Sequence, residues 1–307
     1  MDLAITYRCQ LNCKKCYTGG FKEIKELSTE EWIKIYNILW KIGVPHIVFT
    51  GGEPTLREDL IQLISEAEEF VTGLITNGIK LEELTESLRD ASLDYVQVTI
   101  ESSNPEIHDK MVGYENAFER TSAGIKKALS LGMQVITNTT LTVENAHTFM
   151  DLIKWGKEIG LKYMACNTII CSGRGIKYKK EKELPPIELG KLLSDALELA
   201  NKLDIQLQWY SPTCYLELNP IKLGFGIKQC SAASHNMTIQ PDGTVLPCQS
   251  WGETIGNILK DKWKNIWKHP VARKLRKHEF LRDKCKNCEY LSTCGGGCPL
   301  EYLNREM

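Results

Sequence analysis

One short stretch near the start of the chain reads Cys9-Gln10-Leu11-Asn12-Cys13-Lys14-Lys15-Cys16, directly after an apolar run at residues 3–7. It places three thiols on one loop with the spacing C-x3-C-x2-C. Three thiolates so close together can bind three irons of a cubane [4Fe–4S] cluster, and the fourth iron then has no protein ligand. Such an open metal position can activate a small molecule. The triplet alone also fits half of a zinc site, with the other ligands elsewhere, or three unrelated thiols.

Composition limits the class of protein. The chain has 307 residues, 42% hydrophobic and 25% charged, with a formal net charge of −1. This length suffices for a full α/β core and a small second domain. Near-neutrality gives no reason to expect nucleic acid or a membrane surface as partner. The sequence has neither a signal peptide nor an apolar run of about 18 residues, so we expect a cytoplasmic protein without a membrane span. Its 12 cysteines therefore indicate metal binding rather than disulfides.

Apolar strands and amphipathic helices alternate from Asp2 to about Gln208. The clearest helix start is a capping box formed by Ser28 and, three positions later, Glu31. Six strand–helix units in a row predict an α/β fold with a parallel sheet and right-handed crossovers, although periodicity does not distinguish a barrel from an open sheet. The loops that follow the strands would open at one end of the sheet, where ligands collect. Strands are expected at residues 3–7, 46–50, 73–76, 95–101, 134–140 and 163–170, and helices at 29–42, 57–70, 81–91, 117–131, 146–159 and 188–203.

The second strand ends in Thr50-Gly51-Gly52-Glu53-Pro54. Two glycines let the backbone approach a ligand closely, and a carboxylate beside them can receive an ammonium group. A Gly-Gly turn with an exposed glutamate is the alternative interpretation.

A second group of cysteines follows Pro212. Two alternating strands around Pro241-Asp242-Gly243 predict a hairpin, and helices follow it. The four-cysteine run at the end could alone form a zinc ribbon. The hairpin carries Cys230 and Cys248 in the spacing C-x12-G-x4-C, and the final run contains Cys285, Cys288, Cys294 and Cys298 in the spacing C-x2-C-x5-C-x3-C.

Together these motifs resemble the radical S-adenosylmethionine (SAM) enzymes, in the subgroup with SPASM or twitch extensions. The resemblance implies a partial (β/α)6 radical SAM barrel at residues 1–211 and a small C-terminal cysteine-rich SPASM/twitch-like domain at 212–307. Cys9, Cys13 and Cys16 would hold the [4Fe–4S] cluster that binds SAM, and Gly51, Gly52 and Glu53 would meet the amino group of SAM. The stretch from Val96 to Asp109 resembles V-S-I-D-G…H-D, so Thr99 and Arg120 would hold the SAM carboxylate and Asn138 the ribose. The six later cysteines, Cys230, Cys248, Cys285, Cys288, Cys294 and Cys298, would hold one or two auxiliary [4Fe–4S] clusters.

The chain departs from the family pattern in two places. The residue before the third cysteine is usually aromatic, but here it is Lys15, and Tyr17 follows instead, which leaves the adenine contact open. Family members with two complete auxiliary clusters carry a further cysteine, but none follows Cys298. Six cysteines cannot supply four thiolates to each of two clusters. Either one cluster is fully ligated, or one or both have an open or non-cysteine ligand.

The resemblance implies an enzyme that generates a 5′-deoxyadenosyl radical and abstracts hydrogen from a precursor peptide or protein, in cross-linking, epimerisation or oxidation. An electron donor such as ferredoxin or flavodoxin would reduce it. Small-molecule work, such as haem-precursor or redox-cofactor synthesis, is the main alternative, and a non-catalytic iron–sulfur or zinc protein is another. Sulfatase-maturing enzymes carry an aspartate as base where this chain has Gln249, which argues against that activity.

Three further cysteines, Cys166, Cys171 and Cys214, fit no cluster spacing. Free cysteine is usually a small buried hydrophobic residue. A thiol S–H is also weak enough to quench a carbon radical, as an epimerase requires. Of the three, Cys214 is the candidate hydrogen donor.

Overall fold

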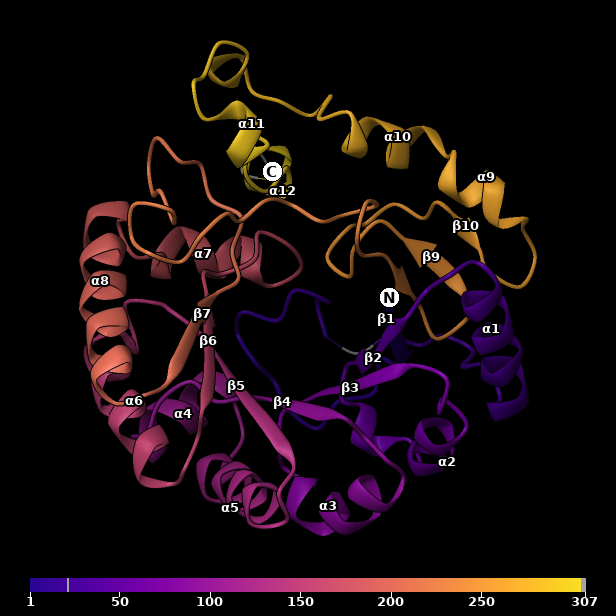
Figure 1. The fold of residues 1–307 in the computed structure, drawn as a ribbon, viewed down its shortest axis with the longest axis horizontal. Coiled ribbons are helices and arrows are strands. Elements are labelled where there is room, and N and C mark those ends of the chain that lie inside the picture. Colours follow the sequence, from indigo (N-terminus) through magenta and orange to yellow (C-terminus); the bar gives the residue numbers. More distant parts are fainter. Residues whose placement is uncertain (21, 305–307) are drawn as a thin grey trace.

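The computed structural model describes residues 1–20 and 22–304 as one curved sheet with helices on its outer side (Figure 1). The strands are β1 (Asp2–Thr6), β2 (His46–Gly51), β3 (Val71–Thr76), β4 (Tyr95–Thr99), β5 (Gln134–Thr140), β6 (Tyr163–Asn167), β7 (Gln206–Trp209), β8 (Thr238–Ile239), β9 (Thr244–Leu246) and β10 (Gly256–Asn257). The helices are α1 (Thr29–Lys41), α2 (Leu60–Ser65), α3 (Leu81–Asp90), α4 (Pro105–Val112), α5 (Ala117–Ser130), α6 (Phe149–Glu158), α7 (Gly175–Lys182), α8 (Pro186–Lys202), α9 (Trp263–Trp267), α10 (Pro270–Arg276), α11 (Leu291–Cys294) and α12 (Leu300–Leu303). No helix in these two ranges is long and apolar enough to cross a membrane.

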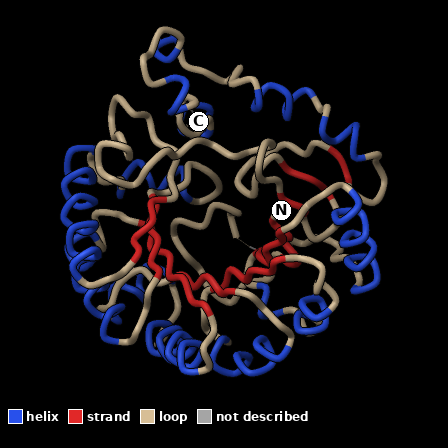
Figure 2. Tube along the Cα trace, viewed as in Figure 1, coloured by secondary structure: helices blue, strands red, loops and turns tan. Residues whose placement is uncertain are grey.

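The sheet has ten strands in the order β10-β9-β8-β1-β2-β3-β4-β5-β6-β7. Strands β1 to β7 are all parallel. On the other side of β1, β8 pairs with it in parallel, and β9 and β10 continue the sheet in antiparallel pairs. Figure 2 shows the strands as an arc with helices outside it. Because β7 and β10 are the two ends of the strand order, the barrel is partial, as predicted.

The secondary structure agrees with the alternation predicted from the sequence. All six expected strands and six expected helices are present, and Ser28 and Glu31 form the predicted capping box at the start of α1. The helix expected at residues 57–70 is the shorter α2, because a 3₁₀ turn at Pro54–Leu56 precedes it and further turns follow. Among the described residues, the helices α4, α7, α11 and α12 and the strand β7 were not predicted.

Half-buried side chains line the inner side of the sheet. In β4, Gln97 and Thr99 are half-buried, whereas Val96 and Val98 between them are fully buried. Strand β5 alternates in the same way, and Thr99 pairs with Asn138 in the parallel register. Paired residues of neighbouring strands point to the same side of a sheet. Thr99 and Asn138 therefore lie side by side near the carboxyl ends of their strands.

A buried polar group closes the ends of β4 and β5. The backbone N–H of Glu101 donates to His108 Nδ1 at 3.1 Å, so the neutral ring carries its proton on Nε2. The Asn145 amide donates to the backbone oxygens of Glu101 at 2.8 Å and Thr140 at 3.1 Å. Burial lowers the pKa of His108 to about 3, and the charge of Lys15 acts in the same direction.

The lowered pKa of His108 predicts a loss of stability in acid. Unfolding lets His108 take up a proton below pH 6.5, whereas the folded protein keeps the ring neutral down to about pH 3. The contribution is therefore complete above pH 6.5 and decreases below it by up to about 1.4 kcal/mol per pH unit. We expect the free energy of unfolding of the metal-free protein, measured with urea, to be about 2 kcal/mol lower at pH 5 than at pH 7 through this ring.

The matched variant is His108→Gln, whose side-chain oxygen can still accept from Glu101 but does not titrate. Its unfolding free energy should change less between pH 7 and pH 5 than that of the parent. Equal changes in the two proteins would show that His108 does not cause the loss.

Candidate active site

The loop of Cys9, Cys13 and Cys16 leaves β1 at the carboxyl end of the parallel strands. It contains turns but neither helix nor strand. The three thiols are partly buried and unbonded to one another. Cys9 Sγ accepts from Asn77 Nδ2 at 4.0 Å, and Cys16 Sγ lies 3.0 Å from the Thr18 hydroxyl. The thiols are also close enough for Cys9 and Cys16 to raise the pKa of Cys13.

The three thiols differ in acidity. Desolvation raises the pKa of Cys9, and raises that of Cys13 to about 12 against the charge of Lys15. At Cys16 desolvation is outweighed by hydrogen bonds from Thr18 and Gly20 and by the charge of Arg174, so its pKa is lowered. Metal ligation requires thiolates. Cys16 is therefore the most readily deprotonated of the three.

Two close backbone contacts fix the start of this loop against the end of β2. Gly52 N donates to Thr6 O at 2.8 Å, and Glu53 N donates to Arg8 O at 2.7 Å. A Cβ atom at Gly52 would lie 2.4 Å from Arg8 O. Since no side chain can occupy that distance, glycine at this position lets the two chain segments touch.

Glu53 is fully buried beneath these contacts rather than exposed. Its Oε1 accepts from Thr55 N at 3.1 Å and from the hydroxyls of Thr55 and Thr76, each at 2.6 Å. Its Oε2 accepts from Asn77 N at 2.7 Å. Burial raises its pKa despite these four bonds. The carboxylate thus joins the ends of β2 and β3 and holds Asn77 beside Cys9.

A buried ion pair ties the middle of the loop to β4. Lys15 Nζ contacts Glu101 Oε1, and the two side chains are 10% and 0% exposed. Glu101 Oε2 accepts from Thr140 N at 3.0 Å. Lys15 stands at the position that is usually aromatic in the family, and Glu101 stands where the family pattern V-S-I-D-G has its aspartate.

The far side of the loop packs against the segment after β6. Arg174 N donates to Cys16 O at 2.9 Å, and its guanidinium contacts Asn12 Oδ1. A Cβ atom at Gly173 would lie 2.6 Å from Tyr17 O. Asn12 N in turn donates to Val112 O at 3.0 Å, at the end of α4.

The remaining residues predicted to bind SAM are not gathered in one place. Thr99 and Asn138 lie side by side, and Asn138 Oδ1 is buried without a hydrogen-bond partner among the described residues. Arg120 is exposed on α5, where its guanidinium lies 5.8 Å from the centre of the Tyr114 ring. Tyr17, next to Cys16, bonds to Thr50, which also accepts from Gln249 Nε2 at 3.3 Å.

The residues present fit an iron–sulfur cluster and an organic ligand at this end of the sheet. In the described parts of the chain, no three His, Cys, Asp or Glu side chains converge as ligands of a single metal ion would. A cubane cluster binds each thiolate at a different iron, so its ligands need not converge on one atom. The partnerless oxygen of Asn138 provides a polar acceptor beyond the loop.

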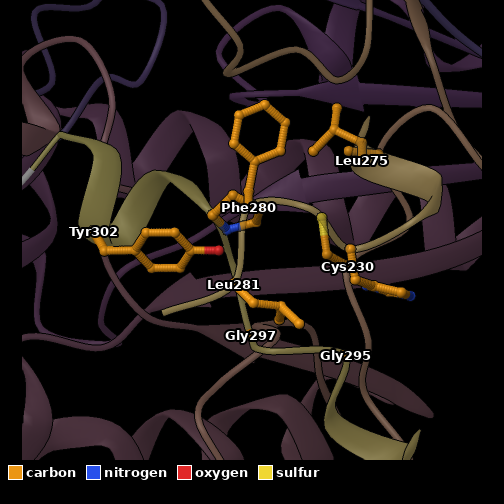
Figure 3. A pocket seen from close by; sticks show the side chains of 10 residues that line it. Cys230, Leu275, Phe280, Leu281, Gly295, Gly297 and Tyr302 are labelled. Atoms are coloured by element: carbon orange, nitrogen blue, oxygen red, sulfur yellow. The ribbon is translucent and has the colours of Figure 1, made fainter. Parts of the chain in front are cut away.

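The later cysteines lie in the C-terminal part of the chain, in two groups. Desolvation raises the pKa of Cys298, and the neighbouring thiols of Cys230 and Cys248 raise it further. Figure 3 shows Cys230 on one side of a pocket and Tyr302 on the other. Cys294 lies beside Cys214. Cys285 and Cys288 lie between α10 and α11, in the four-cysteine run that also contains Cys294 and Cys298 and that we call the cysteine knuckle.

The sequence did not indicate that Asn77 and Lys15 hold the cysteine loop. The run Gly173-Arg174-Gly175 resembles a family element near SAM, with a basic turn as the alternative interpretation, but the contact of Arg174 with the loop was not predicted. The contacts of Asn77 and Lys15 join different strand ends, so no local pattern could have indicated them.

The chain matches the family model of the radical SAM superfamily over residues 3–156 and that of the SPASM iron–sulfur cluster-binding domain over residues 230–289. The AdoMet-dependent heme synthase of Methanosarcina barkeri is 29% identical over 312 residues, which cover 95% of this chain and 88% of the relative. The PqqA peptide cyclase of Bradyrhizobium diazoefficiens is 30% identical over 315 residues, which cover 96% and 80%.

Solved structures share the fold at lower identity. SuiB of Streptococcus suis bound to its precursor peptide SuiA has a TM-score of 0.82 at 19% identity, over 98% of this chain and 72% of that one. The structure of anSMEcpe with bound AdoMet has a TM-score of 0.77 at 19% identity, over 99% and 91%. The chain therefore belongs to the radical SAM superfamily, as an enzyme with a SPASM domain whose cofactors are S-adenosylmethionine and [4Fe–4S] clusters.

Proposed function

We propose that the enzyme modifies a ribosomally made precursor peptide or protein by abstracting hydrogen from it, leading to a cross-link, an epimerised residue or an oxidised residue. The observation that carries this proposal is the 30% identity to a peptide cyclase over 96% of the chain. The fold shared with SuiB, solved with its precursor peptide, agrees with it. We further propose a cytoplasmic location and a ferredoxin or flavodoxin as electron donor.

A cavity lies at the carboxyl end of β6, between the barrel and the cysteine-rich part, and its lining includes Thr168, Lys179, Arg282 and Glu301. Charged and polar side chains of this kind can bind the amide groups of a peptide, and they can equally bind the carboxylates of a haem precursor. The cavity is therefore a candidate substrate site for either class of substrate.

Residues of this chain would bind and orient the cofactors. Cys9, Cys13 and Cys16 would hold the cluster, whose bound form supplies the electron that cleaves SAM to a 5′-deoxyadenosyl radical. The backbone at Gly51 and Gly52, beside Glu53, would meet the amino group of SAM. Thr99, Asn138 and Arg120 remain the proposed contacts to its carboxylate and ribose.

We also propose that residues 1–211 form the SAM-binding barrel and residues 212–307 the auxiliary domain. The family matches at 3–156 and 230–289 fall within these two parts and support the division.

Synthesis of a haem precursor is the second candidate, because a heme synthase is 29% identical over 95% of the chain. The two candidates share the radical chemistry and differ in the substrate.

The first prediction concerns the cluster. We expect the reconstituted enzyme, given SAM and dithionite without oxygen, to form 5′-deoxyadenosine, and Cys9→Ala to abolish this product because one iron ligand is lost. The measurement is liquid chromatography of the reaction. Cys166→Ala, in a buried thiol of β6, is the matched control and should keep the activity. Product from Cys9→Ala at the parent rate would contradict the assignment.

The second prediction concerns the substrate. A short peptide encoded beside this gene is incubated with enzyme, SAM and reductant in deuterated water. Its mass is then measured by mass spectrometry. Loss of the mass of two hydrogens would mean a cross-link or desaturation. Gain of one carbon-bound deuterium would mean epimerisation. An unchanged peptide, with SAM still cleaved, would turn the proposal to the small-molecule candidate.

The third prediction tests Glu53 as a positioning residue. In Glu53→Gln the amide oxygen can keep the threonine bonds, but the amide N–H groups then face Asn77 N–H, which loses its acceptor. We expect the free energy of unfolding of the metal-free protein to fall by about 1–3 kcal/mol. We also expect weaker SAM binding in the holoenzyme, measured by equilibrium dialysis. Glu58→Gln, at an exposed neighbouring position, is the control. Parent-like values for both measurements would refute this role.

A further inference from the structure

The C-terminal part of the chain holds a seventh thiol, that of Cys214, on the segment that follows β7. The carbonyl of Thr213 accepts from Cys294 Sγ at 3.3 Å, and the backbone N–H of Tyr215 donates to the same sulfur. Pro212 O accepts from Cys298 N at 3.1 Å. Residues on both sides of Cys214 therefore contact the cysteine knuckle that contains Cys285, Cys288, Cys294 and Cys298.

Two side-chain contacts fasten this segment to the knuckle. The ring of Tyr215 lies 6.3 Å from that of Tyr290, between Cys288 and Cys294 in the sequence. Glu217 Oε1 forms an ion pair with Lys284 Nζ at 2.7 Å, directly before Cys285. The two contacts meet the knuckle at Lys284 and Tyr290, and Cys285 and Cys288 lie between these residues in the sequence.

The backbones also come very close at Gly297. A Cβ atom there would lie 3.2 Å from the carbonyl carbon of Thr213 and 3.3 Å from Cys214 N. Gly296 and Gly297 donate their backbone N–H groups to Cys294 Sγ, as Tyr215 does. Hydrogen bonds to the sulfur are a usual means of tuning iron–sulfur ligands.

Cys214 is the neighbouring thiol of Cys294, whereas Cys230 and Cys248 are the neighbouring thiols of Cys298. Tyr302 lies close to Cys285 as well as to Cys298 and Cys230, so the two groups adjoin each other. Cys214 also lies at a cavity wall, half-buried rather than packed into the apolar core.

We propose that Cys214 is the fourth thiolate of the auxiliary site formed by Cys285, Cys288 and Cys294. The fourth ligand of this site is then supplied from before the hairpin. The site of Cys230, Cys248 and Cys298 is left with three thiolates and one iron open to a non-cysteine ligand. Binding of iron releases the thiol proton of Cys214, so this residue is not the hydrogen donor considered from the sequence.

The test is an iron count in the full-length chain with Cys9, Cys13 and Cys16 changed to Ala, which leaves only the auxiliary clusters. We expect about eight irons per chain. Adding Cys214→Ala should lower the iron content and alter the electron paramagnetic resonance signal as Cys294→Ala does. The double variant with Cys294→Ala should lose no more than Cys294→Ala alone, whereas the losses of Cys214→Ala and Cys248→Ala should add.

Cys166→Ala in the same background is the control and should change neither measurement. An unchanged iron content and spectrum in Cys214→Ala would overturn the proposal. So would a loss that adds to that of Cys294→Ala but not to that of Cys248→Ala. This test involves no substrate, so its outcome is independent of the peptide proposed above.

A second measurement needs no variant. Iodoacetamide is added to the intact holoenzyme, and in parallel to protein stripped of iron, and alkylation is located by peptide mass spectrometry. We expect Cys214 to be protected together with Cys294 in the holoenzyme and modified after iron removal. Alkylation of Cys214 in the iron-replete protein would refute its role as a ligand.

Discussion

The loop from Cys9 to Cys16 contains no helix or strand, so its shape depends on contacts from the ends of the parallel strands. Glu53 N holds the backbone at Arg8, Asn77 reaches Cys9, and Arg174 N holds Cys16 O. Each contact comes from a different strand end. The curvature of the sheet therefore determines the positions of the thiols, and the loop follows from the fold rather than from its own sequence.

The ion pair of Lys15 and Glu101 is the most demanding of these contacts. Removing two charges from water costs several kcal/mol for each ion, which a close pair regains only with further hydrogen bonds. Thr140 N donates one such bond to the Glu101 carboxylate. The backbone N–H of Glu101 donates to the neutral ring of His108. Breaking the pair would leave a buried charge beside the cysteine loop. The pair thus restricts the loop to one arrangement more than it adds to stability.

Local sequence patterns predicted the parallel sheet, the capping box and the cysteine groups, because periodicity and spacing are properties of neighbouring residues, whereas the partial barrel was implied by the family resemblance. They could not predict the ion pair of Lys15, which depends on how two strand ends meet. The family resemblance gave Arg120 as a SAM contact by its place in the chain, and the structure places this side chain on the exposed face of α5 beside Tyr114, where the contact stays a prediction. The pairing of β8 with β1 was likewise invisible, since β8 has only two residues and its partner is at the other end of the chain.

That pairing makes the two parts of the chain interdependent. A strand at the edge of a sheet exposes unpaired N–H and C=O groups, and without β8 this strand would be β1. Asp2 N donates to Met237 O at 2.9 Å, and Tyr7 Oη donates to Gln240 at 2.9 Å. Because the cysteine loop continues directly from β1, the hairpin that bears Cys248 also supports the strand from which the loop starts. The auxiliary part therefore supports the start of the cysteine loop through the backbone of the sheet.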